Sequence, residues 1–387
     1  MKKVATWVVF CGLFVMLFGP VRVGAETTET LDTEAAAVAD EWHAWQGAVP
    51  PDVADLLPEG FFSEDVGEIE ESVAEASSLK AILSVIGKMT GLTIGENLSL
   101  LAKICGILVL SAVFRAVARG KETVGAVGGA LSLCATLSMV LVIFSILQTR
   151  FSELTAYFAV MKDLGAAMLP LMGALYAMGG NVSAAVANQG VMSAFLSLLE
   201  TGLGATVIPV AGICLALGLL DAVSGKLNLR PLGGLIKRTY TLTFSFLMLM
   251  LCGVLGIQTT LAKGGDTLAL RTMRFAAGSF LPVVGGSVSE ALRTVTGSVQ
   301  YLRGVVGVGG ILVILYAFLP VFLSVLLNRV TFLLCGAAAK LLGCDGEEKI
   351  LSELASVYGY FMAVIASLFV LMIFSLTIFA RCAAAGG

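Results

Sequence analysis

Long apolar stretches alternate with short charged segments along most of this chain. About 20 consecutive apolar residues are enough for a helix to cross the hydrocarbon core of a bilayer. The pattern predicts spans near residues 98–117, 124–147, 154–178, 203–220, 239–257, 305–327 and 354–379. Two mixed stretches, 184–202 and 275–300, stay ambiguous. We therefore expect an all-α polytopic membrane protein with about six to seven transmembrane helices.

Composition supports the same class. Of the 387 residues, 58% are hydrophobic and only 13% are charged, and the mean hydropathy is +0.95. A soluble domain of this size does not bury so much apolar surface. The apolar segments are long and do not alternate residue by residue, so the pattern favours helices over a membrane β-barrel.

The first 25 residues have the pattern of a cleavable signal peptide. Lys2 and Lys3 precede an apolar run over residues 4–19, and Val23 to Ala25 form a small-residue cleavage site. We expect the mature chain to begin at Glu26, outside the cytoplasm. The alternative is an uncleaved first helix.

Residues 26–97 have the pattern of an acidic extracytoplasmic segment with amphipathic helices. Fifteen of the 27 acidic residues lie in 26–79, which has no Lys or Arg. Apolar residues at helical spacing predict a helix ending in Trp42 and Trp45. It is either a docking helix for a partner or membrane surface, or a solvated linker. Residues 79–97 look like a short amphipathic helix on the membrane surface.

Charge also orients the first pair of spans, residues 98–149. Arg115, Arg119 and Lys121 follow the first span directly. By the positive-inside rule this turn is cytoplasmic. That placement agrees with an exterior N-terminus.

Two similar interruptions of apolar sequence suggest an internal repeat. Pro170 and Pro282 lie 112 residues apart, and Pro209 and Pro320 lie 111 apart. Paired glycines follow the first two prolines, and these pairs are Gly179 with Gly180 and Gly285 with Gly286. We expect two related membrane halves, 150–262 and 263–387, with broken helices at matching positions.

A broken helix in lipid must have its free amides satisfied, because each unpaired group costs several kcal/mol. The interruptions should therefore pack against the bundle interior or a neighbouring subunit. Glu200 and Glu290 become candidate interior acids. The alternative places them in solvated turns, and for Glu290 a partner, Arg293, lies one turn away.

Candidate chemistry is sparse. There is one histidine, and the eight cysteines are scattered without a C-x-x-C pair. We expect no metal site, no cofactor and no catalytic residue, because phosphate-binding loops and nucleophile motifs are also missing from the sequence. We expect the lipid bilayer, and no nucleic acid, among the binding partners.

Residues 266–295, DTLALRTMRFAAGSFLPVVGGSVSEALRTV, followed by LLNRV at 326–330, resemble the stage III sporulation protein AE family. The resemblance implies a multi-pass component of the complex encoded by the stage III A operon, in the mother-cell membrane around the forespore. Its implied partners are the other proteins of that operon and, through them, stage II sporulation protein Q. The implied role is a platform or channel subunit of a secretion-like complex, needed for forespore development.

A stand-alone secondary transporter is the competing function, since repeats with broken helices are common in that class. Against it, the sequence has no dense cluster of intramembrane acids for ion coupling. An intramembrane enzyme lacks paired acids or a His-Glu motif. Homo-oligomerisation is left open by the sequence.

Overall fold

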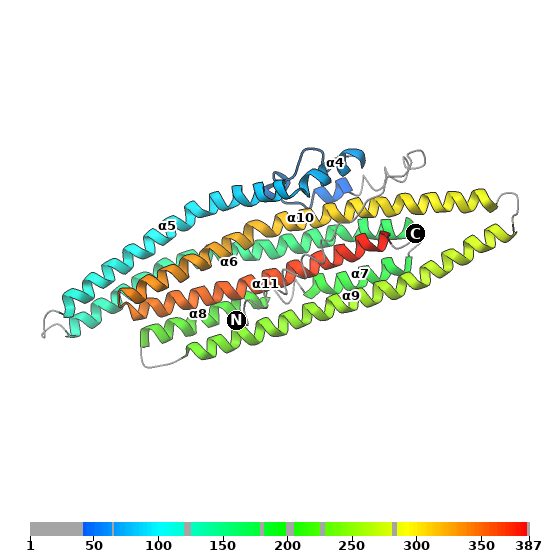
Figure 1. The fold of residues 1–387 in the computed structure, drawn as a ribbon. Coiled ribbons are helices and arrows are strands. Elements are labelled where there is room, and N and C mark those ends of the chain that lie inside the picture. The colour runs from blue at the N-terminus through cyan, green and yellow to red at the C-terminus, as the bar shows by residue number, and fades with distance from the viewer. Residues whose placement is uncertain are drawn as a thin grey trace.

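The computed structural model describes residues 42–63, 66–119, 125–178, 182–198, 205–224, 229–280 and 285–384. No β-strand occurs in these ranges, which confirms the predicted all-α class. The helices are α3 (Pro51–Ala54), α4 (Val66–Ala76), α5 (Leu79–Arg119), α6 (Gly125–Met178), α7 (Val182–Leu198), α8 (Ala205–Ser224), α9 (Arg230–Phe280), α10 (Gly285–Leu341) and α11 (Asp345–Ala384). They form one elongated bundle, shown in Figure 1.

A hairpin of α10 and α11 forms the centre of the bundle. The two helices join through a tight turn in which Gly343 has a φ of +69°. The amide of Cys344 donates to the carbonyl of Ala339 at 2.9 Å, the 6→1 bond that ends helices at a left-handed glycine. Most of α11 is buried, with Leu354 and Val364 fully enclosed.

Helix α5 runs beside α10 in the same direction (Figure 1). The hydroxyl of Tyr316 on α10 bonds the carbonyl of Ala76 just before α5, and Thr331 bonds Asn97 further along. The sequence pattern predicts a surface helix over 79–97 and a separate span after it. The structure has one helix of 41 residues instead, because buried side chains on both parts pack against the same neighbour.

The other long helices also continue through polar sequence. Helix α6 has 54 residues, α9 has 51 and α10 has 57. At 1.5 Å per residue they are about 75–85 Å long, well beyond a hydrocarbon core of about 30 Å. The expected segment boundaries after residues 97, 149 and 262 all fall inside continuous helices, and the division of the chain into these segments stays a prediction.

Within the described ranges, five helices are long and apolar enough to cross a membrane. They are Leu79–Ala116, Leu137–Gly173, Arg230–Val254, Val305–Leu341 and Asp345–Thr377. A shorter apolar helix covers Thr206–Ala222. The expected total of six to seven spans, the repeat and the signal peptide stay predictions.

No helix ends at three of the candidate helix-break or packing prolines, and for Pro209 and Pro320 this agrees with the expected spans 203–220 and 305–327. Pro170, Pro209 and Pro320 lie inside α6, α8 and α10. A proline removes one backbone donor and can bend a helix without ending it. The side chains around Pro170 hold α6 in place, since Leu171 and Met172 beside it are fully buried.

Both tryptophans of the N-terminal segment lie inside the protein. Trp42 is 0% and Trp45 is 1% exposed. The Trp42 Nε1 donates to the carbonyl of Phe61 at 2.9 Å, and the Trp45 Nε1 donates to that of Leu164 on α6 at 3.2 Å. Residues 31–41 of the expected helix lie outside the described residues, and in the described part the tryptophans are not exposed to a partner, a membrane surface or solvent. This part docks on the chain's own helices.

Candidate functional site

Only some of the predicted site residues lie within the described part of the chain. Gly179, Gly180, Glu200 and Pro282 lie outside the described residues. Gly285 and Gly286 are the first residues of α10, and Glu290 follows within the same helix, but its side chain is not among those described.

The prolines inside helices are not buried. Pro170 and Pro209 are exposed on the bundle surface, and Pro320 is partly buried. On the isolated chain, Pro170 and Pro209 therefore do not face the bundle interior. Packing of these positions against a neighbouring subunit stays a prediction.

The structure reveals buried charges that the sequence pattern does not single out. Glu347, in the first turn of α11, is 0% exposed. It accepts a hydrogen bond from Ser111 at 2.7 Å and pairs with Nη2 of Arg115 at 2.6 Å, both on α5. Nη1 of Arg115 also donates to the carbonyl of Gly343 at 3.1 Å. One arginine thus joins the end of α5 to the α10–α11 turn.

The thiol of Cys344 lies beside this pair. Its sulfur is 3.9 Å from Ser111 Oγ and from the carbonyl of Leu108. Burial raises the pKa of the Cys344 thiol, so the neutral form predominates at physiological pH. Such a cysteine acts as a small apolar side chain in packing.

A second buried pair joins α9 to α11. Lys237 and Glu353 form an ion pair with side chains 6% and 5% exposed. Gly218 of α8 lies against Glu353 so closely that a Cβ there would overlap the glutamate side chain. A Cβ at Gly233 of α9 would be in ordinary contact, 3.6 Å from Glu353 Oε1. Gly218 therefore makes room for a carboxylate between three helices.

A third acid completes this polar layer. Asp221, near the end of α8, is 3% exposed and lies 3.4 Å from Nζ of Lys349 on α11. It also accepts the backbone amide of Leu229 at 3.0 Å, which fixes the entry to α9. Arg230 at the start of α9 bonds Ser352. We call the three pairs Arg115–Glu347, Lys237–Glu353 and Asp221–Lys349 the buried ion-pair layer.

Apolar side chains cover the outside of the bundle around this layer. Exposed residues of this band include Val109, Leu110, Val113, Leu137, Leu141, Phe144, Ile213, Leu220, Leu232, Leu235, Leu333, Leu334 and Leu341. A charged layer beneath an apolar exterior is strongly desolvated once lipid covers that exterior, and such residues are costly unless paired. Each buried acid of the described residues has its base, so the layer is neutral and can fix how α5, α8, α9 and α11 align.

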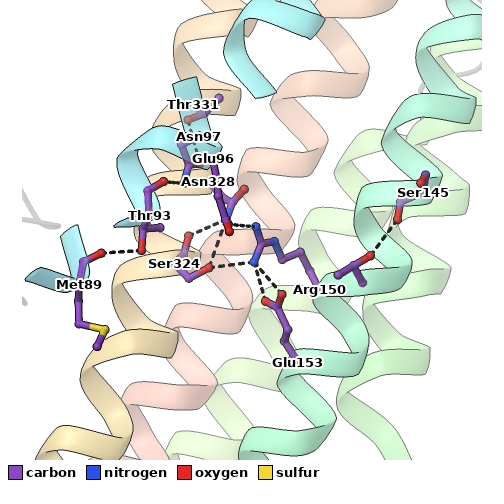
Figure 2. A network of polar contacts seen from close by, with 11 residues as sticks. Met89, Thr93, Glu96, Asn97, Ser145, Arg150, Glu153, Ser324, Asn328 and Thr331 are labelled. Carbon is purple, nitrogen blue, oxygen red and sulfur yellow. Dashed lines mark hydrogen bonds and ion pairs between the residues drawn. The ribbon is translucent and has the colours of Figure 1, made fainter. Parts of the chain in front are cut away.

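A separate polar network joins α5, α6 and α10, as Figure 2 shows. Arg150 of α6 donates to both carboxylate oxygens of Glu153, at 2.7 and 2.8 Å, and to Ser324 of α10 at 3.3 Å. Its Nη2 lies 3.4 Å from Glu96 of α5. The hydropathy pattern predicts the end of a span near residue 150, but Arg150 is only partly exposed and is bound to side chains of α5 and α10.

Next to this network is a cleft of about 500 Å³. Its lining comprises Glu96, Asn97, Leu100, Lys103, Leu141, Val142, Ser145, Arg150 and Asn328. Asn328 is 0% exposed, and its Oδ1 has no hydrogen-bond partner. Asn328 belongs to the LLNRV motif, although no role for it follows from the sequence. The sequence feature that points to Asn328 is a side-chain amide inside an apolar run. Such an amide is costly to bury without hydrogen-bond partners.

Among the described residues, no group of three or more His, Cys, Asp or Glu side chains could hold a metal ion. The charged groups are instead paired between helices, an arrangement that suits assembly of a bundle.

Comparison with known proteins identifies the family. The model of the stage III sporulation protein AE family matches residues 65–383. Stage III sporulation protein AE of Bacillus subtilis (strain 168) is 25% identical over 373 residues, which cover 92% of this chain and 88% of the relative. No solved structure matches the chain. The match includes the residues of the ion-pair layer and the cleft, and the chain therefore belongs to the stage III sporulation protein AE family.

Proposed function

We propose that this chain is a non-enzymatic platform or channel subunit of the mother cell–forespore sporulation complex, needed for forespore development. The observation that carries the proposal is the family match over residues 65–383. The partners would be the other stage III A operon proteins and, through them, stage II sporulation protein Q. Long helices that extend beyond a bilayer support the proposal, because they offer surface for such partners.

The proposed location is the mother-cell membrane around the forespore. The ends of α5, α8 and α10 and the starts of α6, α9 and α11 lie at one end of the bundle (Figure 1). Basic residues outside the buried ion-pair layer concentrate there, including Arg119, Arg230 and Lys340. By the positive-inside rule this end is cytoplasmic. The tryptophan-containing segment and the C-terminus would then be extracytoplasmic, with six crossings if α8 is counted.

A stand-alone transporter remains the second candidate. It would draw support from the proposed repeat, in which α7 and α8 correspond to the single helix α10. The buried ion-pair layer argues against ion coupling, because every buried carboxylate in the described residues already has a basic partner.

Two measurements distinguish the candidates. Tagged protein from sporulating membranes should co-purify with the operon's other products, while the pure protein in liposomes should give no solute flux. Flux by the pure protein without any co-purifying partner would favour the transporter. Gly285→Leu should lose the partners but keep membrane insertion if the helix start at Gly285 packs against a neighbouring subunit.

A further inference from the structure

The cleft between α5 and α6 has an unused hydrogen-bond acceptor at its base. The Nδ2 of Asn328 donates to the carbonyl oxygen of Ser324 at 2.7 Å. A carbonyl can only accept, so this contact assigns Nδ2 to the Ser324 side and leaves Oδ1 free. Because Asn328 is 0% exposed and its Oδ1 is unpartnered, the site lacks a hydrogen-bond donor. An unsatisfied buried acceptor is costly, which points to a ligand.

The charges lining the cleft indicate what else the ligand carries. Lys103 is exposed and has no ion pair with any described residue. Arg150 adds a second positive charge and Glu96 one negative charge. Arg150 also pairs with Glu153 just outside the lining, so the positive charge left unpaired is that of Lys103, which a monoanion would neutralise. A phosphate diester with hydroxyl donors satisfies both requirements.

The surroundings of the cleft indicate that this phosphate belongs to a lipid. Leu141, which lines the cleft, is 72% exposed, and Leu98 and Phe144 nearby are each 65% exposed. Apolar surface of α5 and α6 continues from here toward the basic end, with Val109 and Leu110 exposed. The charged residues Glu96, Arg150 and Glu153 lie at the opposite end of the cleft, away from the basic end of the bundle. A headgroup in the cleft would leave its acyl chains along this apolar surface.

We propose that the cleft binds an anionic phospholipid whose headgroup carries hydroxyl donors, such as phosphatidylglycerol. The phosphate lies by Lys103 and Arg150, and a headgroup hydroxyl donates to Oδ1 of Asn328. The cleft volume of about 500 Å³ is in the usual range for ligand sites, about 300–1,000 Å³. A zwitterionic lipid fits less well, because it carries no net negative charge to balance the unpaired charge of Lys103.

The test uses the full-length protein in nanodiscs with equal amounts of phosphatidylglycerol, phosphatidylethanolamine and phosphatidylcholine. After extraction into detergent, mass spectrometry measures which lipids stay bound. We expect phosphatidylglycerol to exceed each zwitterionic lipid about tenfold, the effect of one charge-assisted contact. Equal retention of the three lipids would overturn the proposal, and preference for phosphatidylethanolamine would overturn its charge argument.

Two matched variants control for folding. Lys103→Glu should reduce phosphatidylglycerol retention about tenfold, because it reverses the charge of an exposed side chain. Lys88→Glu, on the same helix and also exposed but outside the cleft, should leave retention unchanged. Equal loss in both would indicate general surface attraction and contradict a defined site. Displacement of bound lipid by millimolar glycerol 3-phosphate or inorganic phosphate would instead assign the cleft to a soluble phosphate.

Discussion

Lys237 of α9 and Glu353 of α11 form an ion pair that is almost completely buried between three helices. The pair lies within the part of the bundle whose outer surface is apolar, so both charges depend on each other for solvation. This dependence makes the pair a sensitive test of how α9 and α11 align.

Removal of one partner should destabilise the bundle, because it leaves the other charge buried alone. Lys237→Met or Glu353→Met should each lower stability by about 3–5 kcal/mol. The double variant should recover most of this loss, since two unbranched apolar side chains fill the same space. Resistance to thermal unfolding in detergent measures the effect. Additive losses in the double variant would show that the two residues do not act as a pair.

Gly218 of α8 should tolerate no side chain. Its Cβ would meet the Glu353 side chain, so Gly218→Ala should force α8 away from α11 and cost about 1–3 kcal/mol. Gly212→Ala on the same helix is the control, because a Cβ there meets no described atom within 4 Å. It should be neutral or stabilising by up to about 1 kcal/mol through helix propensity. Apparent melting temperatures compare the two, and equal shifts would contradict the close approach.

Gly309 of α10 should hold the tryptophan segment in place. A Cβ at this position would lie 2.7 Å from Cη2 of Trp42 and 3.3 Å from Val73. Gly309→Val should therefore displace Trp42, shift tryptophan emission to longer wavelength and expose residues 42–63 to protease. Gly336→Ala, where the nearest described side-chain atom is 3.7 Å away on Leu351, serves as the control. A protected segment in Gly309→Val would mean that the docking does not depend on this contact.

The sequence supports the all-α membrane class because apolar runs of about 20 residues are typical of helices that cross a bilayer. It is less informative about where helices end. Polar residues such as Arg150 resemble span ends, but α6 continues through this arginine, which bonds Glu153 and Ser324. Pro170 resembles a break, although α6 continues through it.

The ion-pair layer is hidden in the sequence for a different reason. Its partners are far apart in the chain, 232 residues for Arg115 and Glu347 and 116 for Lys237 and Glu353. Hydrophobic periodicity reports which face of one helix is buried, and it does not say which helix lies opposite. The free Oδ1 of Asn328 likewise depends on neighbours from two other helices.

The orientation of the bundle in the membrane is tested most directly by two single cysteines in an otherwise cysteine-free chain. Ser78→Cys lies at the start of α5 beside the docked N-terminal segment, and Asp345→Cys lies at the basic end; both native side chains are exposed. In intact cells a membrane-impermeant maleimide should label the cysteine at 78 and reach the cysteine at 345 only after permeabilisation. Labelling of both from outside, or the reverse pattern, would contradict the proposed placement.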